Sequence, residues 1–203
     1  MRRTIAICAV VAGLASCSSA DAGTRVVYVA PVGANGDQVE GLTVARAVHG
    51  HCEPGSDSVP GSTYRCFFGN FIEDPCWADA IVAGSLLCMT QPWSTTVVRI
   101  YVSELEPSTE PVPTNLNYPW GVELTTGEKC VAFQGAHDVY RGRVVDYGCN
   151  GAYSHRGRVL LRRMYRSQPS WSFDSAWWTG SKYQPRKRVQ VRVAWYGGPN
   201  PGA

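Results

Sequence analysis

Runs in which apolar and polar residues alternate recur along the chain, and a period of two is typical of half-buried β-strands. The clearest run covers residues 189–196, where Val189, Val191, Val193 and Trp195 would face one side of a sheet. Shorter runs predict strands at residues 25–30, from 42 to near 52, 64–68, 86–90, 95–103, 121–124, 129–133, 143–147 and 158–164.

The segments between these runs are typical of turns and extended connections. Residues 125–128 (TTGE) predict a hairpin turn, and residues 106–120 hold four prolines that favour an extended crossover. Residues 77–84 are the one helical candidate outside the leader. Together with 21 Gly and 13 Pro, the many short strands predict a mainly β protein. We expect a small disulfide-stabilised sandwich or partly open barrel, with few or no helices outside the signal peptide.

The first residues have the layout of an export signal. Two arginines precede ten apolar residues, 5–14, which would form only about 15 Å of helix and are too short to span a bilayer. The Leu-Ala-Ser-Cys sequence that ends at Cys17 resembles the lipobox of bacterial lipoprotein signals. We therefore expect residues 1–16 to be removed and Cys17 to become a lipidated N-terminus that anchors the protein to the outer face of the cell membrane.

Two other fates of the leader are conceivable. An ordinary signal peptidase could cut after Ala20-Asp21-Ala22 and release a soluble protein, or the leader could stay as an anchor, which its short apolar core disfavours. Downstream of the signal we expect a tether at residues 17–24, a single β-rich extracytoplasmic domain at 25–196 and a flexible tail at 197–203.

Six cysteines remain after Cys17, and an even number in an exported chain indicates three disulfides. Pairing of sequence neighbours is the simplest choice among the 15 connectivities. It joins Cys52 to Cys66, Cys76 to Cys88 and Cys130 to Cys149. The third pair is the firmest because each of its cysteines closes a strand-like run, whereas the first two pairs could exchange partners.

Charge divides the chain into an acidic and a basic part. Residues 18–139 hold 5 basic and 14 acidic residues, a balance of −9, whereas residues 141–203 hold 12 basic and 2 acidic residues, a balance of +10. The two parts could pack together and neutralise each other. Alternatively, the basic part offers a cationic face to lipid headgroups, an anionic cell-wall polymer or an envelope protein. Nucleic acid is not expected as a partner of an exported protein.

Residues 162–183 combine three Trp, two Tyr and one Phe with cationic side chains. Exposed rings beside polar groups bind sugars, and arginine with tryptophan suits anionic interfaces. The candidate binding residues are Arg162, Arg163, Arg166, Trp171, Trp177, Trp178, Lys182 and Arg186. In the alternative interpretation the rings fill the core and the arginine stems cover them from outside.

No pattern in the sequence assigns catalytic, metal or cofactor residues. His49, His51 and Cys52 cannot complete a tetrahedral zinc site without further ligands, and no G-x-S-x-G nucleophile motif accompanies the candidate bases His137 and His155. We interpret the carboxylate pairs Glu73–Asp74 and Glu104–Glu106 as solvated turn residues. We therefore expect no metal and no cofactor.

Three stretches carry a resemblance to known proteins: YRCFFGNFIEDPCW (64–77), YPWGVELTTGEKCVAFQGAHDVYRGRVVDYGC (118–149) and VQVRVAWY (189–196). Their spacing of cysteine, D-P-C, P-W and Y-G-C is similar to that of uncharacterised exported proteins of high-GC Gram-positive bacteria, which occur as lipoproteins or extracytoplasmic domains. The resemblance implies the same compartment and a disulfide framework, and it carries over no catalytic residue.

These observations lead to one functional expectation and two alternatives. We expect a membrane-anchored, non-catalytic binding or accessory module of the cell envelope. The first alternative is an envelope hydrolase that acts on glycan, peptide or ester bonds of the wall. The second is a secreted protease-inhibitor-like module that uses a disulfide-pinned loop at residues 53–62.

Overall fold

A computed structural model of the chain describes residues 23–108, 118–150, 156–167 and 169–198. Within these ranges all regular secondary structure is strand, so this part of the chain has no helix long and apolar enough to cross a membrane. The first seven strands are β1 (Arg25–Val29), β2 (Thr43–His49), β3 (His51–Pro54), β4 (Tyr64–Phe68), β5 (Phe71–Ala78), β6 (Ser85–Cys88) and β7 (Thr96–Tyr101). The other seven are β8 (Gly121–Leu124), β9 (Lys129–Ala132), β10 (Val139–Tyr140), β11 (Arg143–Cys149), β12 (Gly157–Tyr165), β13 (Trp171–Trp178) and β14 (Tyr183–Gly197).

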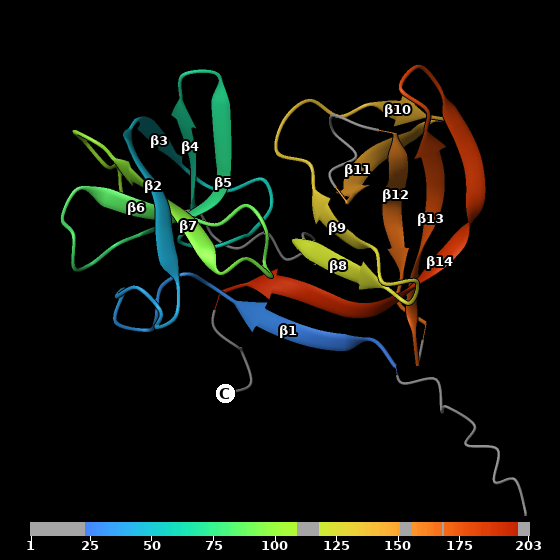
Figure 1. The fold of residues 1–203 in the computed structure, drawn as a ribbon, viewed down its shortest axis with the longest axis horizontal. Helices are drawn as coiled ribbons and strands as arrows, with labels where there is room; N and C mark the ends of the chain where they lie inside the picture. The colour runs from blue at the N-terminus through green and yellow to red at the C-terminus, as the bar shows by residue number, and fades with distance from the viewer. Residues whose placement is uncertain (1–22, 109–117, 151–155, 168, 199–203) are drawn as a thin grey trace, which may run out of the picture.

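The C-terminal strands close into a barrel, seen on the right of Figure 1. Its strand order is β14-β13-β12-β11-β9-β8, and β8 pairs with β14 to complete the circle. Closure depends on the length of β14, whose first part pairs with β13 while its last part pairs with β8 and, in parallel, with β1. The interior is filled by residues such as Leu160, Phe173 and Tyr147, which are almost completely buried.

The strands from β2 to β7 form a second, six-stranded sheet with the order β2-β7-β6-β5-β4-β3. The two edge strands, β2 and β3, follow each other in sequence through Gly50 alone, so the sheet curls and its edges meet at that corner. Gly50 donates its amide to the carbonyl of Tyr101, and a Cβ at this position would lie 2.5 Å from the carbonyl oxygen of Phe67. Only glycine allows the backbones to approach this closely.

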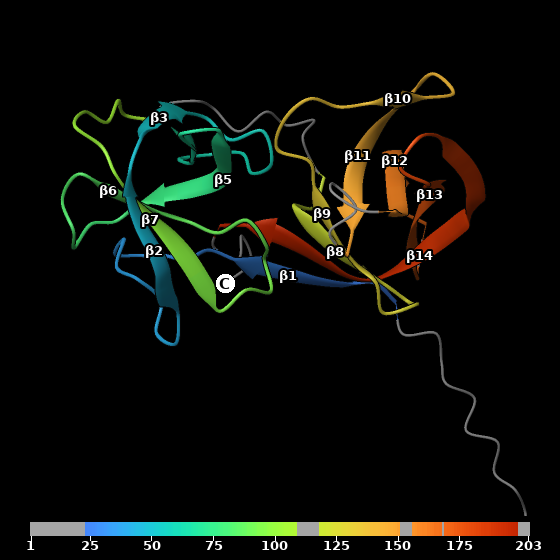
Figure 2. The ribbon, with the colours of Figure 1, turned by 45° about the horizontal axis from the view of Figure 1, so that its top comes forward.

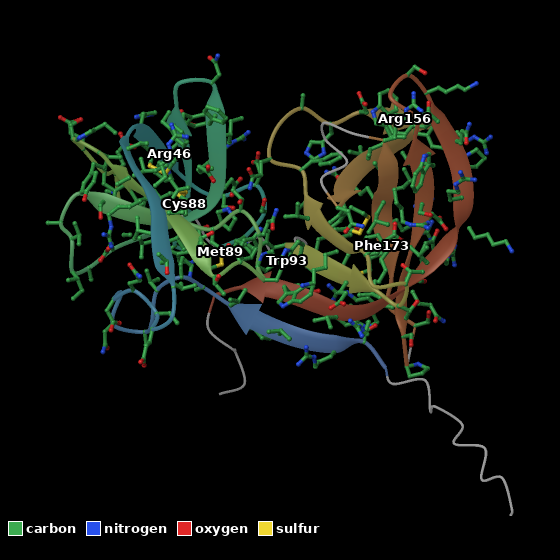
Figure 3. The ribbon with its side chains drawn as sticks, viewed as in Figure 1. Arg46, Cys88, Met89, Trp93, Arg156 and Phe173 are labelled. Atoms are coloured by element: carbon green, nitrogen blue, oxygen red, sulfur yellow. A yellow bond between two sulfur atoms is a disulfide. The ribbon has the colours of Figure 1, made fainter. Side chains whose placement is uncertain are left out.

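Two strands and a shared apolar cluster join the barrel to the second sheet. β1 and the end of β14 run between the two lobes, as Figures 1 and 2 show. The cluster contains Trp77, Leu87 and Met89 from the second sheet and Trp120 from the barrel side, with the rings of Trp77 and Trp120 5.9 Å apart. Figure 3 shows Met89 and Trp93 at this junction and Phe173 inside the barrel.

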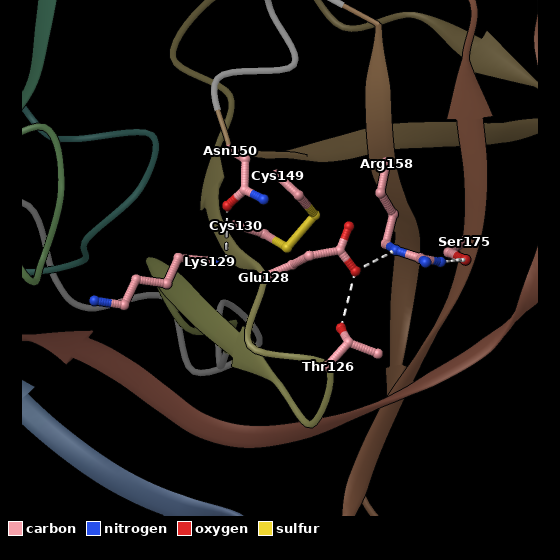
Figure 4. Close-up of a disulfide and its surroundings, with 8 residues drawn as sticks. All are labelled: Thr126, Glu128, Lys129, Cys130, Cys149, Asn150, Arg158 and Ser175. Carbon is pink, nitrogen blue, oxygen red and sulfur yellow. Dashed lines mark hydrogen bonds and ion pairs between the residues drawn. A yellow bond between two sulfur atoms is a disulfide. The ribbon is translucent and has the colours of Figure 1, made fainter.

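Three disulfides staple neighbouring antiparallel strands. They join Cys52 to Cys66 across β3 and β4, Cys76 to Cys88 across β5 and β6, and Cys130 to Cys149 across β9 and β11. The third bond lies in the barrel wall beside Glu128 and Arg158 (Figure 4). The pairing of sequence neighbours is therefore confirmed.

The mainly β, disulfide-stabilised class is confirmed, with a barrel that is closed rather than partly open. The hairpin turn at residues 125–128 is confirmed by the hydrogen bond from the Leu124 amide to the Glu128 carbonyl. The helical candidate at residues 77–84 is wrong, because β5 continues to Ala78 and bends and turns follow. Residue 197, expected in the tail, is the last residue of β14. The signal peptide, Cys17 and residues 199–203 lie outside the described residues.

Candidate functional site

The candidate binding residues come from β12, β13 and the first part of β14, but the structure distributes them over different places. Arg163 and Arg166 are exposed on β12 and just beyond its end, Arg186 is exposed on β14, and Lys182 lies in the turn before that strand. Arg162 is different, since its guanidinium faces a cavity between the barrel and the second sheet. The predicted set is therefore not one continuous patch.

All three tryptophans are half-buried, but they differ in whether the ring packs against the barrel core. Trp171 and Trp178 pack against the two core clusters of the barrel, and the ring of Trp178 lies 4.7 Å from that of Tyr183. Trp177 is outside both clusters, and the guanidinium of Arg186 lies 5.7 Å from its ring centre. Of the three, only Trp177 lies outside the barrel core, as the surface interpretation requires.

The outer wall of the barrel carries a cationic cluster around one carboxylate, Asp174. It accepts hydrogen bonds from Arg143 (2.5 Å), Arg188 (2.9 Å) and the hydroxyl of Tyr165 (2.9 Å). Burial alone would raise the pKa of Asp174, but the three donors outweigh it and lower the pKa to about 2. Arg188 also lies over the ring of Tyr165 at 3.6 Å. The cluster therefore remains charged at every physiological pH.

The described chain begins beside the barrel, at the start of β13. Thr24 donates its amide to the carbonyl of Pro169 (3.0 Å) and its hydroxyl to the carbonyl of Val191 (2.6 Å). It also accepts the amide of Trp171 (2.8 Å). Arg166 lies at the same end, with its guanidinium 5.0 Å from the Trp171 ring centre and bonded to the Tyr196 hydroxyl at 2.9 Å. Arg25, also exposed, is the next residue of the chain.

The acidic and basic parts of the chain neutralise each other only in part. Among the described residues, two Arg–carboxylate pairs connect them, Arg158 with Glu128 and Arg192 with Glu123. Arg143, Arg162 and Arg188 pair with carboxylates of the basic part itself. The remaining seven basic residues after position 140 make no ion pair within the described ranges: Arg141, Arg156, Arg163, Arg166, Lys182, Arg186 and Lys187.

A cavity of about 530 Å³ separates the outer face of β11 and β12 from the loop between β3 and β4. Polar and aromatic residues from both lobes line it: Ser56, Asp57, Ser58, Tyr118, Pro119, Ala132, Phe133, Gly135, His137, Asp146, Tyr147 and Arg162. Its size is in the range of small-molecule binding sites.

The barrel side of the cavity holds an ordered polar group. Arg162 donates two parallel hydrogen bonds to Asp146, from Nε and from one terminal nitrogen, each 2.8 Å long. These bonds raise the pKa of the Arg162 guanidinium further. The Nδ1 atom of His137 lies 3.1 Å from the Val145 carbonyl oxygen and 3.5 Å from an Asp146 carboxylate oxygen. Sequence analysis named His137 as a candidate base, and the structure places it beside a carboxylate.

The opposite wall is fixed by a buried carboxylate on β5. Asp74 accepts hydrogen bonds from the Ser56 hydroxyl and from the Asp57 amide, the latter 2.9 Å long. The Ser56 oxygen in turn accepts the amides of Ser58 and Val59 at 3.0 and 2.9 Å. Ser56 is thus a turn-forming residue of this loop, held away from the role of a nucleophile.

Asp74 is buried and Glu73 is half-buried rather than solvated, which corrects the expectation for this pair. Burial raises the pKa of Glu73 to about 7 and that of Asp74 to about 6. For Glu73 the charge of Arg46 opposes the effect of burial, and for Asp74 the hydrogen bonds from Ser56 and Asp57 do so. One carboxylate oxygen of Glu73 is buried without a hydrogen-bond partner.

Other candidate ligands and bases are not brought into this cavity. His49 and His51 are exposed at the β2–β3 corner, where His49 lies 5.5 Å from the Tyr101 ring and His51 lies 3.6 Å from Glu53. The sulfurs of Cys66, Cys76 and Cys88 lie within 4.8 Å of one another, but each belongs to a disulfide and offers no thiolate to a metal. His155 lies outside the described residues.

Sequence analysis missed Asp146 and Tyr118 as members of a site. The alternation of Val145, Asp146 and Tyr147 was a usable signal, because a charged residue between two core residues of a strand must point out of the barrel. Tyr118 had no such signal, since it lies in the proline-rich segment before β8.

The fold and site define a mainly β, disulfide-stabilised protein in which a closed six-stranded barrel carries a cationic outer surface and shares a polar cavity with a second sheet. Comparison with known proteins adds no relative, since no protein family, curated protein or solved structure matches this chain.

Proposed function

We propose that the protein is an exported binding module of the cell envelope, tethered through a lipid on Cys17, and that the barrel end beside the tether rests on an anionic lipid surface. The observation that carries this proposal is the position of Thr24. The described chain begins between β13 and β14, next to Arg25, Arg166 and Trp171. We call these three residues the tether-side patch.

The tether is short enough to hold this patch at the membrane. The seven residues that follow Cys17 and end at Thr24 span at most about 25 Å when fully extended. A diacylglyceryl group supplies the two acyl chains that stable anchoring needs. An anionic surface attracts each nearby Lys or Arg by about 1 kcal/mol within a Debye length of about 8–10 Å. Trp171 adds an amphipathic ring of the kind that favours the headgroup region.

The unpaired positive charge of the barrel supports attraction to an anionic surface, and Arg166 is the member of that unpaired set that lies in the tether-side patch. Seven basic residues of the barrel make no ion pair within the described ranges, so their positive charge is presented to the surroundings. An anionic wall polymer would be attracted by the same charges. We favour lipid headgroups because the described residues begin beside the patch, within reach of a lipid on Cys17.

Two other functions find less support. A hydrolase would need a nucleophile beside His137, whereas the Ser56 hydroxyl is bonded to Asp74 and accepts two backbone amides. An inhibitor loop needs a projecting apolar tip, whereas Val59, in the loop at residues 53–62, is 1% exposed and lies against Gly197 of β14. We therefore propose binding rather than catalysis or inhibition.

Co-sedimentation with vesicles tests the proposal on a chain of residues 18–203, which lacks the leader and keeps every described residue. We expect this chain to bind phosphatidylglycerol vesicles at low salt and to release them as salt rises. The double variant Arg25→Gln with Arg166→Gln should bind about 2 kcal/mol more weakly, roughly thirtyfold in the dissociation constant.

The matched control is Arg141→Gln with Arg156→Gln, which removes the same charge at the opposite end of the barrel, where Figure 3 labels Arg156. This variant should bind nearly as well as the parent chain. If both double variants weaken vesicle binding equally, binding depends only on the net charge of the protein, and the proposed orientation is overturned. Retention on purified wall but not on vesicles would make the wall polymer the partner instead of lipid.

A further inference from the structure

The cavity between the barrel and the second sheet is not needed for membrane docking, and its construction indicates a ligand of its own. Residues from five separate segments of the chain line its volume of about 530 Å³. Both walls are rigidly held, one by the barrel strands β11 and β12 and the other by the loop that Asp74 fixes.

In its neutral form, His137 offers this cavity a hydrogen-bond acceptor. A carbonyl oxygen only accepts hydrogen bonds, so the contact of 3.1 Å from His137 Nδ1 to the Val145 carbonyl places the hydrogen of the neutral ring on Nδ1. The lone pair of Nε2 is then available, and Nε2 has no hydrogen-bond partner among the described residues. The neutral form of His137 is therefore an oriented acceptor.

Arg162 presents oriented donors beside it. Its Nε and one terminal nitrogen are bonded to Asp146, which leaves the other terminal nitrogen unbonded within the described part of the chain. The Arg162 side chain is 53% exposed, whereas that of Asp146 is only 10% exposed. The buried carboxylate thus holds the guanidinium in place while its outer edge stays open to a ligand.

The charges around the cavity balance. Asp146 is paired with Arg162, and Asp57 is paired with Arg65. A phosphate or carboxylate ligand would be repelled by these two carboxylates and attracted by the two arginines that pair with them. The net electrostatic attraction for an anion is therefore small. A neutral ligand with many hydroxyl groups suits these walls better, because each hydroxyl both donates and accepts. Phe133, Pro119 and Tyr118 supply apolar surface of the kind that packs against a sugar ring.

We infer that this cavity is a binding site for a neutral carbohydrate, with His137, Asp146 and Arg162 as its polar contacts. The site is independent of the tether-side patch, because none of its lining residues belongs to that patch. In the intact protein a sugar bound here would lie between the two lobes and contact both.

Titration of the 18–203 chain followed by amide NMR tests the inference. The probes are three neutral disaccharides, cellobiose, maltose and N,N′-diacetylchitobiose, with glucose 6-phosphate as the anionic comparison. We expect saturable shifts of the amides of Gly135, Asp146 and Tyr147 with at least one neutral disaccharide. Glucose 6-phosphate should bind at least tenfold more weakly than that disaccharide.

The adjacent pair Arg162 and Arg163 provides matched variants. Arg162→Gln should weaken the disaccharide at least tenfold, whereas Arg163→Gln, which is exposed and does not line the cavity, should leave its affinity unchanged. His137→Phe provides a second test of the same site and should weaken binding to a similar extent.

Three results would each overturn the inference: no saturable shifts with any of the three disaccharides, equal effects of the two arginine variants, or tighter binding of glucose 6-phosphate than of the disaccharides. Vesicle binding should be the same for Arg162→Gln and the parent chain, which separates this outcome from that of the proposed docking.

Discussion

Glu73 and Asp74 show how single residues set the pH response of this fold. Both pKa values are raised by burial, to about 7 and about 6, so the folded chain binds protons more tightly than the unfolded chain does. The tighter proton binding stabilises the folded chain fully at pH values below the ordinary pKa values of 4.5 and 3.8. This stabilisation is lost as pH rises through about 6 to 7. Asp174 acts in the opposite sense, since its contribution is present above pH 3.8 and is lost as pH falls through about 2.

Glu73→Gln should stabilise the protein at pH 8. Glutamine keeps the shape of the protonated acid and removes a charge whose buried oxygen has no hydrogen-bond partner. We expect the free energy of unfolding to rise by about 1–2 kcal/mol at pH 8, with little change at pH 4. Urea unfolding at the two pH values, with the exposed Glu40→Gln as control, measures the difference. A loss of stability at pH 8 would mean that the carboxylate of Glu73 makes a favourable interaction that outweighs its burial.

At the scale of strands, the corner between β2 and β3 determines how the second sheet curls. Its single connecting residue, Gly50, has no space for a side chain, because a Cβ would lie 2.5 Å from the Phe67 carbonyl oxygen and 3.0 Å from the Ile100 side chain. Backbone on one side and a buried side chain on the other leave little room for adjustment. The curl of the sheet therefore depends on this residue.

Gly50→Ala should destabilise the fold by about 1–3 kcal/mol, the usual effect of overpacking. Thermal unfolding of the variant against the parent measures it. The control is Gly135→Ala, where the nearest atom, Ile72 Cδ1, is at an ordinary contact distance of 3.9 Å. Unchanged unfolding of Gly50→Ala would show that the corner can open without cost.

Strand prediction worked where alternation was regular and failed where bulges interrupt it. The strands at residues 64–68 and 121–124 match β4 and β8, but β13 was missed because its core residues Phe173 and Ala176 lie three apart across a register shift. The same effect changes the predicted face of residues 189–196. Beyond the bulge in β14, Ala194 replaces Val193 in the barrel core, and Trp195 packs on Trp93 instead.

The candidate site could be predicted only in fragments, because its members meet through barrel closure. His137, Asp146 and Arg162 belong to three segments, and the local pattern places Asp146 outside the barrel without saying what it faces. The predicted cationic set contained Arg162, but hydrophobic pattern and composition could not separate it from its neighbour Arg163. The pairing of β8 with β14, which completes the barrel, joins residues about 70 positions apart.

At the scale of the whole molecule, the proposed orientation follows from the unpaired basic residues of the barrel and from the position of Thr24 beside Arg25 and Arg166. The acidic second sheet and the basic barrel wall pack through an apolar cluster around Trp77 and Trp120. The two Arg–carboxylate pairs that join residues 18–139 to residues 141–203 among the described residues, Arg158–Glu128 and Arg192–Glu123, both lie within the barrel. The barrel therefore keeps unpaired positive charge, and a lipid at Cys17 would hold the end that carries Arg25 and Arg166 at the membrane. Three disulfides suit the oxidising space in which such a protein would work.

Export and anchoring are the basis of this account, and the intact mass of the protein isolated from its native membrane tests them directly. We predict a chain that begins at Cys17, carries a diacylglyceryl group and weighs six hydrogens less than its reduced form, as three disulfides require. An intact leader that begins at Met1, or six free thiols after position 17, would contradict the account.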